Sequence, residues 1–199
     1  MPTVCASRFR AFQFLALAAA LLAPWLGHAA AAPDTLWSLL KGGGQVVLMR
    51  HAITTPGVGD PAGMRLDDCR SQRNLSGEGR SHARRVGAAF GARGIAIERV
   101  LASPWCRCME TARLAFGSAE GAPALGNLFG RPENSAAQVR DLRILLERAN
   151  GPGNLVLVSH GSTIAELTGV YLDTAEMLVV TPQAAGGHVI RGRLSVPPR

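Results

Sequence analysis

Two short apolar runs constrain the fold of this chain more than any other feature of its sequence. Gln45–Met49 reads QVVLM after the glycines at 42–44, and Leu155–Ser159 reads LVLVS after the glycines at 151 and 153. Runs of this length without polar alternation are typical of strands that are buried on both faces. Because such strands occur in sheets covered by helices on both sides, the two runs predict an α/β fold.

The segments around these two runs alternate between helix and strand patterns. We expect helices at 76–91, 103–117, 136–149 and 162–169, further strands at 99–102, 177–181 and 188–194, and a third strand or a loop at 123–129. Ser103 followed by Pro104 predicts a helix N-cap with proline at the first helical position. The chain from 33 to 199 is therefore expected to form a single domain.

The first 29 residues have the pattern of a secretory signal peptide. Arg8 and Arg10 precede an apolar run at 11–26, and small residues follow at 27–32, which allows cleavage between 29 and 32. The run is shorter than the ~20 residues of a membrane-spanning helix, and Pro24 interrupts it, although an uncleaved anchor is the alternative. We therefore expect an exported protein, periplasmic or secreted, without stable membrane insertion after cleavage.

Three cysteines remain after such cleavage: Cys69, Cys106 and Cys108. An oxidising compartment permits a disulfide, and an odd number leaves one thiol over. Because Cys106 and Cys108 are too close in the chain to bridge each other comfortably, we expect Cys69 to pair with one of them. A zinc site is the alternative, but the C-x-C pair lacks a second ligand pair at zinc spacing.

The positive charge of the chain does not indicate a nucleic-acid partner. The net charge is +7, yet aromatic residues make up only 5% of the sequence. Stacking on single strands needs aromatic side chains interleaved with the basic ones. We therefore interpret Arg80, Arg84 and Arg85 as a solvated helix face.

Four other basic side chains lie just after the predicted strands. Arg50 and His51 directly follow the first strand, Arg107 lies in the first turn after the second, and His160 directly follows LVLVS. In open α/β sheets, ligands bind at the carboxyl ends of the strands. Two guanidinium groups, two imidazoles and nearby helix N-termini at one edge predict a site for an oxyanion, and a phosphoryl group is the obvious candidate.

Four ordered motifs carry a resemblance to a known family. LMRHA (48–52), NLSGEGRSHA (74–83), SPWCRCMETA (103–112) and VSHG (158–161) resemble the motifs of the histidine phosphatase superfamily, which has the phosphoglycerate mutase-like fold. The resemblance implies a three-layer α/β/α sandwich with a mostly parallel sheet, and a phosphohistidine intermediate that needs no metal or cofactor. By motif position, His51 matches the nucleophile, while the phosphate pocket is matched by Arg50, Thr54, Arg107 and His160.

The chain departs from the family pattern at the general acid. Many relatives carry a glutamate after the third strand, whereas the comparable stretch here, 124–127, reads ALGN. Glu176 resembles a position seen in small exported members and is our candidate proton donor, with Glu133 and the pair Asp67–Asp68 as lesser options. Without an acid, phosphoramidates or anhydrides would be favoured over alkyl esters.

Two functions from different classes follow from these observations. The first is an exported phosphatase that acts on a phosphomonoester or a related phosphoryl group, carried by a small substrate or by an envelope glycan or lipid. The second is a phosphate-recognising binding protein of the same fold that has lost turnover. Mutase activity is less favoured, because the small chain leaves little room for a lid over a bisphosphate.

Overall fold

The computed structural model describes Met1, residues 32–149 and residues 151–198. Residues 2–29, which hold nearly all of the predicted export segment, lie outside this described part. Within it, no helix is both long and apolar enough to cross a membrane.

A mixed six-stranded sheet forms the centre of the domain, in the order β3-β2-β4-β1-β5-β6. Its strands are β1 (Val46–Arg50), β2 (Ile97–Ala102), β3 (Glu120–Gly121), β4 (Asn154–Ser159), β5 (Met177–Pro182) and β6 (His188–Leu194). The first four strands in this order run parallel, whereas β5 is antiparallel to β1 and β6 is antiparallel to β5. The predicted α/β fold with a mostly parallel sheet is confirmed.

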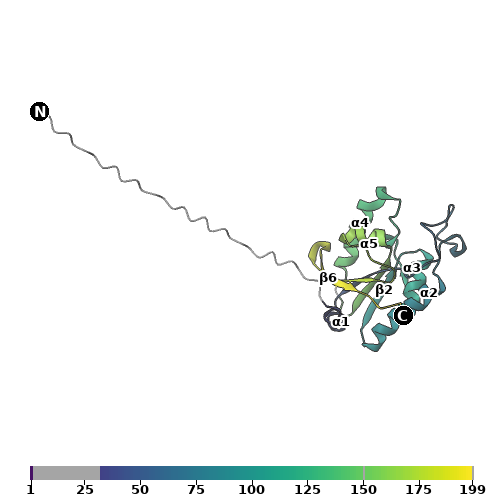
Figure 1. The fold of residues 1–199 in the computed structure, drawn as a ribbon, viewed down its shortest axis with the longest axis horizontal. Coiled ribbons are helices and arrows are strands. Elements are labelled where there is room, and N and C mark those ends of the chain that lie inside the picture. The colour runs from purple at the N-terminus through teal and green to yellow at the C-terminus, as the bar shows by residue number, and fades with distance from the viewer. Residues whose placement is uncertain (2–31, 150, 199) are drawn as a thin grey trace.

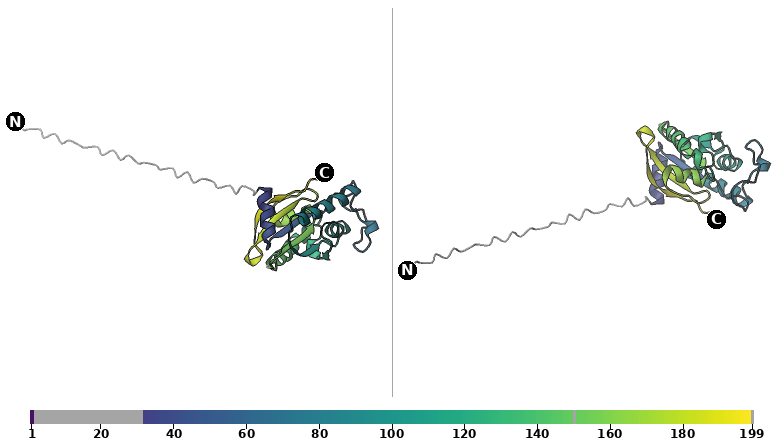
Figure 2. Two further views of the ribbon diagram at one scale, coloured as in Figure 1. Left: turned by 90° about the horizontal axis from the view of Figure 1, so that it is seen from below. Right: turned by 90° about the horizontal axis from the view of Figure 1, so that it is seen from above.

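Helices cover both faces of this sheet, as Figures 1 and 2 show. They are α1 (Pro33–Gly42), α2 (Gly77–Ala92), α3 (Cys106–Phe116), α4 (Ser135–Glu147) and α5 (Gly161–Thr168). One buried cluster joins α1, α2 and α3 to Val47 and Met49 of β1, and a second joins α4 and α5 to Val46 and Leu48. Alternate side chains of β1 thus enter two different cores, which explains why this strand lacks polar alternation.

Helix α2 begins with an N-cap at Ser76, as the sequence predicts. The Ser76 hydroxyl accepts a hydrogen bond from the Gly79 N–H at 3.0 Å, which is an N-cap interaction. A Cβ atom at Gly79 would overlap the carbonyl group of Ile53, so only glycine permits this close approach. The contact fixes the start of α2 against the segment that follows β1.

The predicted start of α3 is wrong by a few residues. The helix begins at Cys106 with Trp105 as its N-cap residue, not at Ser103 and Pro104. Ser103 instead directly follows β2 and stays attached to β4, because its N–H donates to the carbonyl of Val158 at 2.9 Å. The Ser103 hydroxyl lies 2.8 Å from Nε2 of His160.

The segment 123–129, expected as a strand or a loop, holds a 3₁₀ turn at Pro123–Leu125 after the short strand β3.

A disulfide joins the long loop after β1 to the N-terminus of α3. Cys69 starts the 3₁₀ turn Cys69–Ser71 and is bonded to Cys106, whereas Cys108 is free and buried. The expected pairing of Cys69 with one of the two neighbouring cysteines is therefore confirmed, and Cys106 is the partner. Beside the bridge, the Cys106 N–H donates to Oε1 of Gln72 at 2.9 Å.

Removal of this bridge should destabilise the protein. The two cysteines are 37 residues apart, and a loop of that length predicts a loss of about 3–4 kcal/mol in the free energy of unfolding. We expect this loss in a Cys69→Ala/Cys106→Ala double variant, measured by urea unfolding. Reduced wild-type protein should lose a similar amount, and an unchanged stability in both samples would contradict the prediction.

Candidate active site

Four side chains that the sequence places on different elements meet at the carboxyl edge of the parallel strands. Arg50 ends β1 and His51 follows it, His160 follows β4, and Arg107 lies in the first turn of α3 after β2. All four line one pocket with a volume of about 310 Å³. The ring centroids of the two histidines are 5.4 Å apart. The expected convergence of two arginines and two histidines on one site is therefore present.

The backbone around His51 fixes the orientation of its ring. Its Nδ1 lies 2.9 Å from the carbonyl oxygen of Ala52, a contact that requires the proton on Nδ1 and leaves the lone pair on Nε2. The His51 N–H donates to the carbonyl of Ser159 at 2.9 Å, which ties the end of β1 to the end of β4. The Ala52 N–H donates to Oγ1 of Thr111 on α3 at 3.0 Å. Three elements thus hold the nucleophile candidate in place.

Burial and nearby positive charges keep His51 neutral. The pKa of His51 is lowered from 6.5 to about 3, mainly by burial. The hydrogen bond to Ala52 opposes this shift, and the charges of Arg107, Arg50 and Arg73 add to it. An uncharged imidazole with a free lone pair is the nucleophilic form of histidine. The surroundings of His51 therefore favour attack on an electrophile at neutral pH.

His160 is held in the same uncharged state. Burial is the main cause that lowers its pKa well below 6.5, and the electrostatic interaction with His51 and the charges of the nearby arginines lower it further. Its Nδ1 lies 3.3 Å from Nη2 of Arg107 and accepts that donor, so the ring proton resides on Nε2 and points to the Ser103 hydroxyl at 2.8 Å. His160 thus helps to orient Arg107.

Arg107 is almost fully buried and is paired with a carboxylate that sequence reasoning missed. Its side chain is 1% exposed, and its two Nη atoms lie 2.6 and 3.1 Å from the two oxygens of Asp60. The Asp60 carboxylate also accepts hydrogen bonds from the Trp105 indole N–H and the Arg73 backbone N–H. Although burial acts to raise the pKa of Asp60, the hydrogen bonds and charge of Arg107 hold it below its ordinary value.

Arg73 is a further pocket residue that the sequence did not single out. It lies in the loop between β1 and α2, lines the pocket, and donates from Nη1 to the carbonyl of Gly57 at 2.7 Å. Arg50 donates from Nη1 to the carbonyl of Leu172 at 2.8 Å and lies 5.1 Å from the ring centre of Tyr171. In the described part of the chain, the buried Nε atoms of all three arginines have no hydrogen-bond partner. All three arginines line the pocket, so their positive charges favour an anion there.

Two predicted site residues are not brought to this pocket. Oε2 of Glu176 accepts hydrogen bonds from the Asp173 N–H at 2.8 Å and from Nη1 of Arg193 at 3.2 Å. Thr54 forms a β-bridge with Leu75. Neither Glu176 nor Thr54 is among the described residues that line the pocket. The same holds for the lesser candidates, which are Asp67, Asp68 and Glu133.

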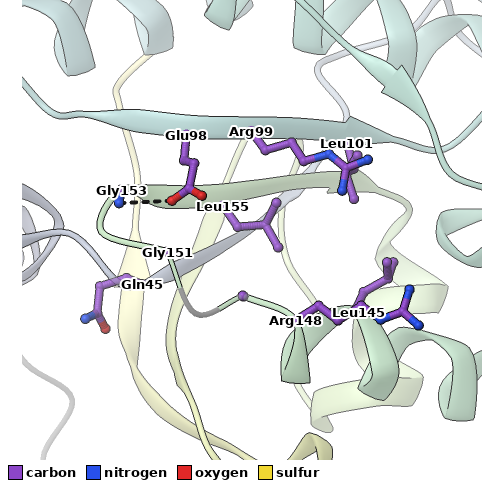
Figure 3. Close-up of a pocket in the computed structure, with 10 residues that line it drawn as sticks. Gln45, Glu98, Arg99, Leu101, Leu145, Arg148, Gly151, Gly153 and Leu155 are labelled. Atoms are coloured by element: carbon purple, nitrogen blue, oxygen red, sulfur yellow. Dashed lines mark hydrogen bonds between the residues drawn. The ribbon is translucent and has the colours of Figure 1, made fainter.

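A second pocket lies at the opposite edge of the sheet, where the parallel strands begin (Figure 3). Its volume is about 170 Å³, and it lies beside the starts of β2 and β4. The Glu98 carboxylate accepts a hydrogen bond from the Gly153 N–H at 3.1 Å, so it secures the turn before β4. None of the predicted catalytic residues lines this second pocket.

The chain matches no family model and no curated protein. Solved structures, however, share its fold. A protein histidine phosphatase SixA complexed with tungstate is 24% identical, with a TM-score of 0.53, over 76% of this chain and 96% of that one. A phosphoserine phosphatase from Entamoeba histolytica is 14% identical, with a TM-score of 0.56, over 77% and 98%. A mycobacterial glucosyl-3-phosphoglycerate phosphatase is 19% identical, with a TM-score of 0.51, over 68% and 89%.

These likenesses establish the class of fold. The chain shares the α/β fold of these three solved structures, and this is the fold class that the four sequence motifs implied. The roles of the individual side chains rest on the geometry of the pocket described above.

The neutral state of His51 should appear in the pH dependence of stability. Unfolded chains protonate histidine near pH 6.5, whereas folded His51 protonates only near pH 3. The free energy of unfolding should therefore fall as the pH drops from 6.5 toward 3, by at most ~1.4 kcal/mol per pH unit for this residue. Urea unfolding across this range should show a shallower fall for His51→Gln, and an identical slope in both proteins would contradict the pKa shift.

The Asp60–Arg107 pair should matter far more for stability than an exposed pair. Asp60→Asn leaves the buried charge of Arg107 without its counter-ion, which we expect to cost on the order of 3 kcal/mol. Glu120→Gln is the matched control, because Glu120 is exposed and pairs with the exposed Arg99. Thermal and urea unfolding should show a clear loss for Asp60→Asn and little change for Glu120→Gln, and equal stabilities would refute this role.

Proposed function

We propose that this protein is a phosphatase that hydrolyses a phosphomonoester or a related phosphoryl group through a phosphohistidine intermediate on His51, without requiring a metal. The observation that carries this proposal is the pocket itself, in which a neutral imidazole faces a space bordered by Arg50, Arg73 and Arg107. The three similar structures are each a phosphatase, which supports this proposal.

In the first step, Nε2 of His51 attacks phosphorus in line with the departing group. The three guanidinium groups neutralise the phosphoryl oxygens, and planar guanidinium donors suit the geometry of such oxyanions. Because the Nδ1 proton is already hydrogen-bonded to Ala52, the positive charge that develops on the ring is stabilised without a proton transfer. Covalent capture replaces one difficult displacement by two easier ones.

In the second step, water attacks the phosphohistidine. The P–N bond breaks, the electron pair returns to Nε2, and phosphate leaves the pocket. The low pKa of His51 makes the neutral ring a good leaving group in this step. The enzyme then regains its starting state with Nδ1 still donating to Ala52.

A phosphate-recognising binding protein is the second candidate function. No carboxylate is among the described residues that line the pocket, and turnover of many phosphate esters depends on a proton donor. A binding protein would take up phosphate or vanadate without forming a phosphohistidine, so trapping experiments separate the two candidates.

The cellular location and the molecule that bears the phosphoryl group are further proposals, and both rest on the sequence. The signal-like segment at 1–29 favours the periplasm or the exterior, where the bond between Cys69 and Cys106 would be stable. There the substrate would be a small phosphorylated compound or a phosphoryl group on an envelope glycan or lipid. Detection of the cleaved chain in the periplasmic fraction tests the location.

Replacement of His51 should eliminate turnover while the pocket still binds anions. We expect purified protein, treated with a chelator, to hydrolyse p-nitrophenyl phosphate, and His51→Asn to lose this activity to background. A phosphohistidine, which is labile in acid and stable in alkali, should be trapped on the wild-type protein and be missing from the variant. Vanadate binding by calorimetry and circular dichroism report whether the variant keeps its pocket and fold. Unchanged hydrolysis by a folded His51→Asn protein would overturn the mechanism.

A further inference from the structure

We infer that the pocket recognises the organic part of its substrate as well as the phosphoryl group, and that this organic part carries an aromatic ring. The ring lies against an apolar rim, which consists of Val58, Phe129 and Tyr171. The inference rests on the proposed phosphatase function and names its substrate class, which is phosphate monoesters with an aromatic ring close to the ester oxygen.

The exposed apolar side chains of the protein are concentrated at this pocket. In the described part of the chain after Met1, six large apolar side chains are exposed: Val58, Leu66, Phe129, Ile144, Tyr171 and Ile190. The three that form the apolar rim are the most exposed of these, at 89%, 60% and 56%, and all three line the pocket of His51. Single exposed apolar side chains are ordinary, whereas a group of them around one pocket indicates a binding surface.

The Phe129 ring is exposed although its backbone is held in place. The Phe129 N–H donates to Oδ1 of Asn127 at 3.1 Å. The preceding residue, Leu128, is buried, and its N–H donates to Oγ1 of Thr163 on α5 at 3.3 Å. The ring lies beside the loop after β1, since a Cβ atom at Gly59 would be 3.9 Å from Cε1 of Phe129. A ring on an ordered backbone loses little further freedom when a ligand covers it, which favours binding.

Tyr171 is positioned by contacts with other residues around the pocket. Its ring lies against the start of α5, because a Cβ atom at Gly161 would be only 2.9 Å from Cζ of Tyr171. The guanidinium carbon of Arg50 is 5.1 Å from the centre of the same ring. The next residue, Leu172, is fully buried, and its carbonyl accepts the hydrogen bond from Arg50. An aromatic surface is therefore fixed beside one of the arginines that face the phosphoryl group.

The polar groups at the pocket suit an apolar substituent better than a polyol. Oδ1 of Asn127 accepts hydrogen bonds from the Ser162 hydroxyl at 3.0 Å and from the Phe129 N–H, so this acceptor is already occupied. No carboxylate is among the described residues that line the pocket. Each hydroxyl of a sugar brings a donor that needs an acceptor when it is buried. The rim therefore favours a small aromatic phosphate over a phosphorylated glycan.

A neighbouring hollow extends the space beside the rim. Its volume is about 490 Å³. It shares four lining residues with the pocket of His51, which are Val58, Gly59, Asn127 and Phe129. Met64 and Trp105 add further apolar surface to it. A ring that contacts Phe129 while its phosphoryl group lies among the arginines thus has room for substituents.

The first test compares the binding of phosphonates, whose P–C bond is not hydrolysed. 2-Phenylethylphosphonate and ethylphosphonate carry the same anion on the same linker and differ only in the ring. Calorimetry should show about 10–100-fold tighter binding of the first, the range expected for burial of a phenyl group. Hexylphosphonate has a similar apolar surface without a ring and should bind more weakly than 2-phenylethylphosphonate, because a flexible chain loses more conformational freedom.

The second test compares turnover of 2-phenylethyl phosphate, ethyl phosphate and glucose 6-phosphate. All three are esters of primary alcohols, so differences in kcat/KM report recognition of the organic part rather than the ease with which the alcohol departs. We expect kcat/KM for 2-phenylethyl phosphate to exceed both other values by about 10–100-fold.

Variants assign the preference to the apolar rim. Phe129→Ala should weaken binding of 2-phenylethylphosphonate by roughly tenfold, and Phe129→Leu, which keeps apolar bulk without a ring, should lose less. Ile190→Ala is the matched control, because Ile190 is an exposed apolar residue of β6 that is not among the described residues lining either hollow. It should leave all three phosphonate affinities unchanged. Circular dichroism and unfolding curves establish that each variant is folded.

The outcomes separate this inference from the proposed function. Equal affinities for 2-phenylethylphosphonate and ethylphosphonate would overturn the inference, as would tighter binding of hexylphosphonate or an unchanged preference in folded Phe129→Ala. His51-dependent hydrolysis in the same preparations would leave the proposed function intact. Conversely, tight binding of 2-phenylethylphosphonate by a protein without His51-dependent turnover would refute the proposed function and retain the ring-binding rim.

Discussion

The buried guanidinium group of Arg107 is the constraint on which the rest of the site depends. A charge that is 1% exposed is tolerated in a protein interior only when it is paired and hydrogen-bonded. Asp60 supplies the counter-charge, and His160 accepts a further hydrogen bond on the other side. The need to satisfy this one group therefore draws together the loop after β1, the start of α3 and the end of β4.

The same concentration of positive charge sets the chemistry of the two histidines. An imidazolium ion among three guanidinium groups would be repelled and poorly solvated, so both rings stay neutral. The hydrogen bond from Nδ1 of His51 to Ala52 then decides which nitrogen carries the lone pair. A phosphoryl dianion would relieve the repulsion between the arginines, because it brings the negative charge that the pocket lacks. In the proposed reaction, binding of the phosphoryl group and activation of His51 thus have one electrostatic origin.

The sequence predicts the scaffold of this site well, because the helices and strands that form the two buried clusters have periodic or uninterrupted apolar patterns in the sequence. Strands β1 and β4 are evident as apolar runs, and residues that directly follow them, such as His51 and His160, are located by the topology alone. Asp60 and Arg73 were missed because they lie in a loop of irregular structure, where no period relates a residue to its neighbours in space. Glu176 was chosen by position in the chain, yet Arg193 of the adjacent strand β6 binds its carboxylate, and only the strand pairing reveals that contact.

That irregular loop nevertheless has to place Asp60 and Arg73 against α3 with the accuracy that a charged pocket requires. Loops of this length have little core of their own and lose much conformational entropy when they are ordered. The bond from Cys69 to Cys106 reduces this cost, because it fastens the loop to the residue directly before Arg107. Gln72 adds a hydrogen bond to the Cys106 N–H beside the bridge. The covalent link thus lies next to the ion pair that orders the site, so the loop is most constrained where the geometry of the pocket is most demanding.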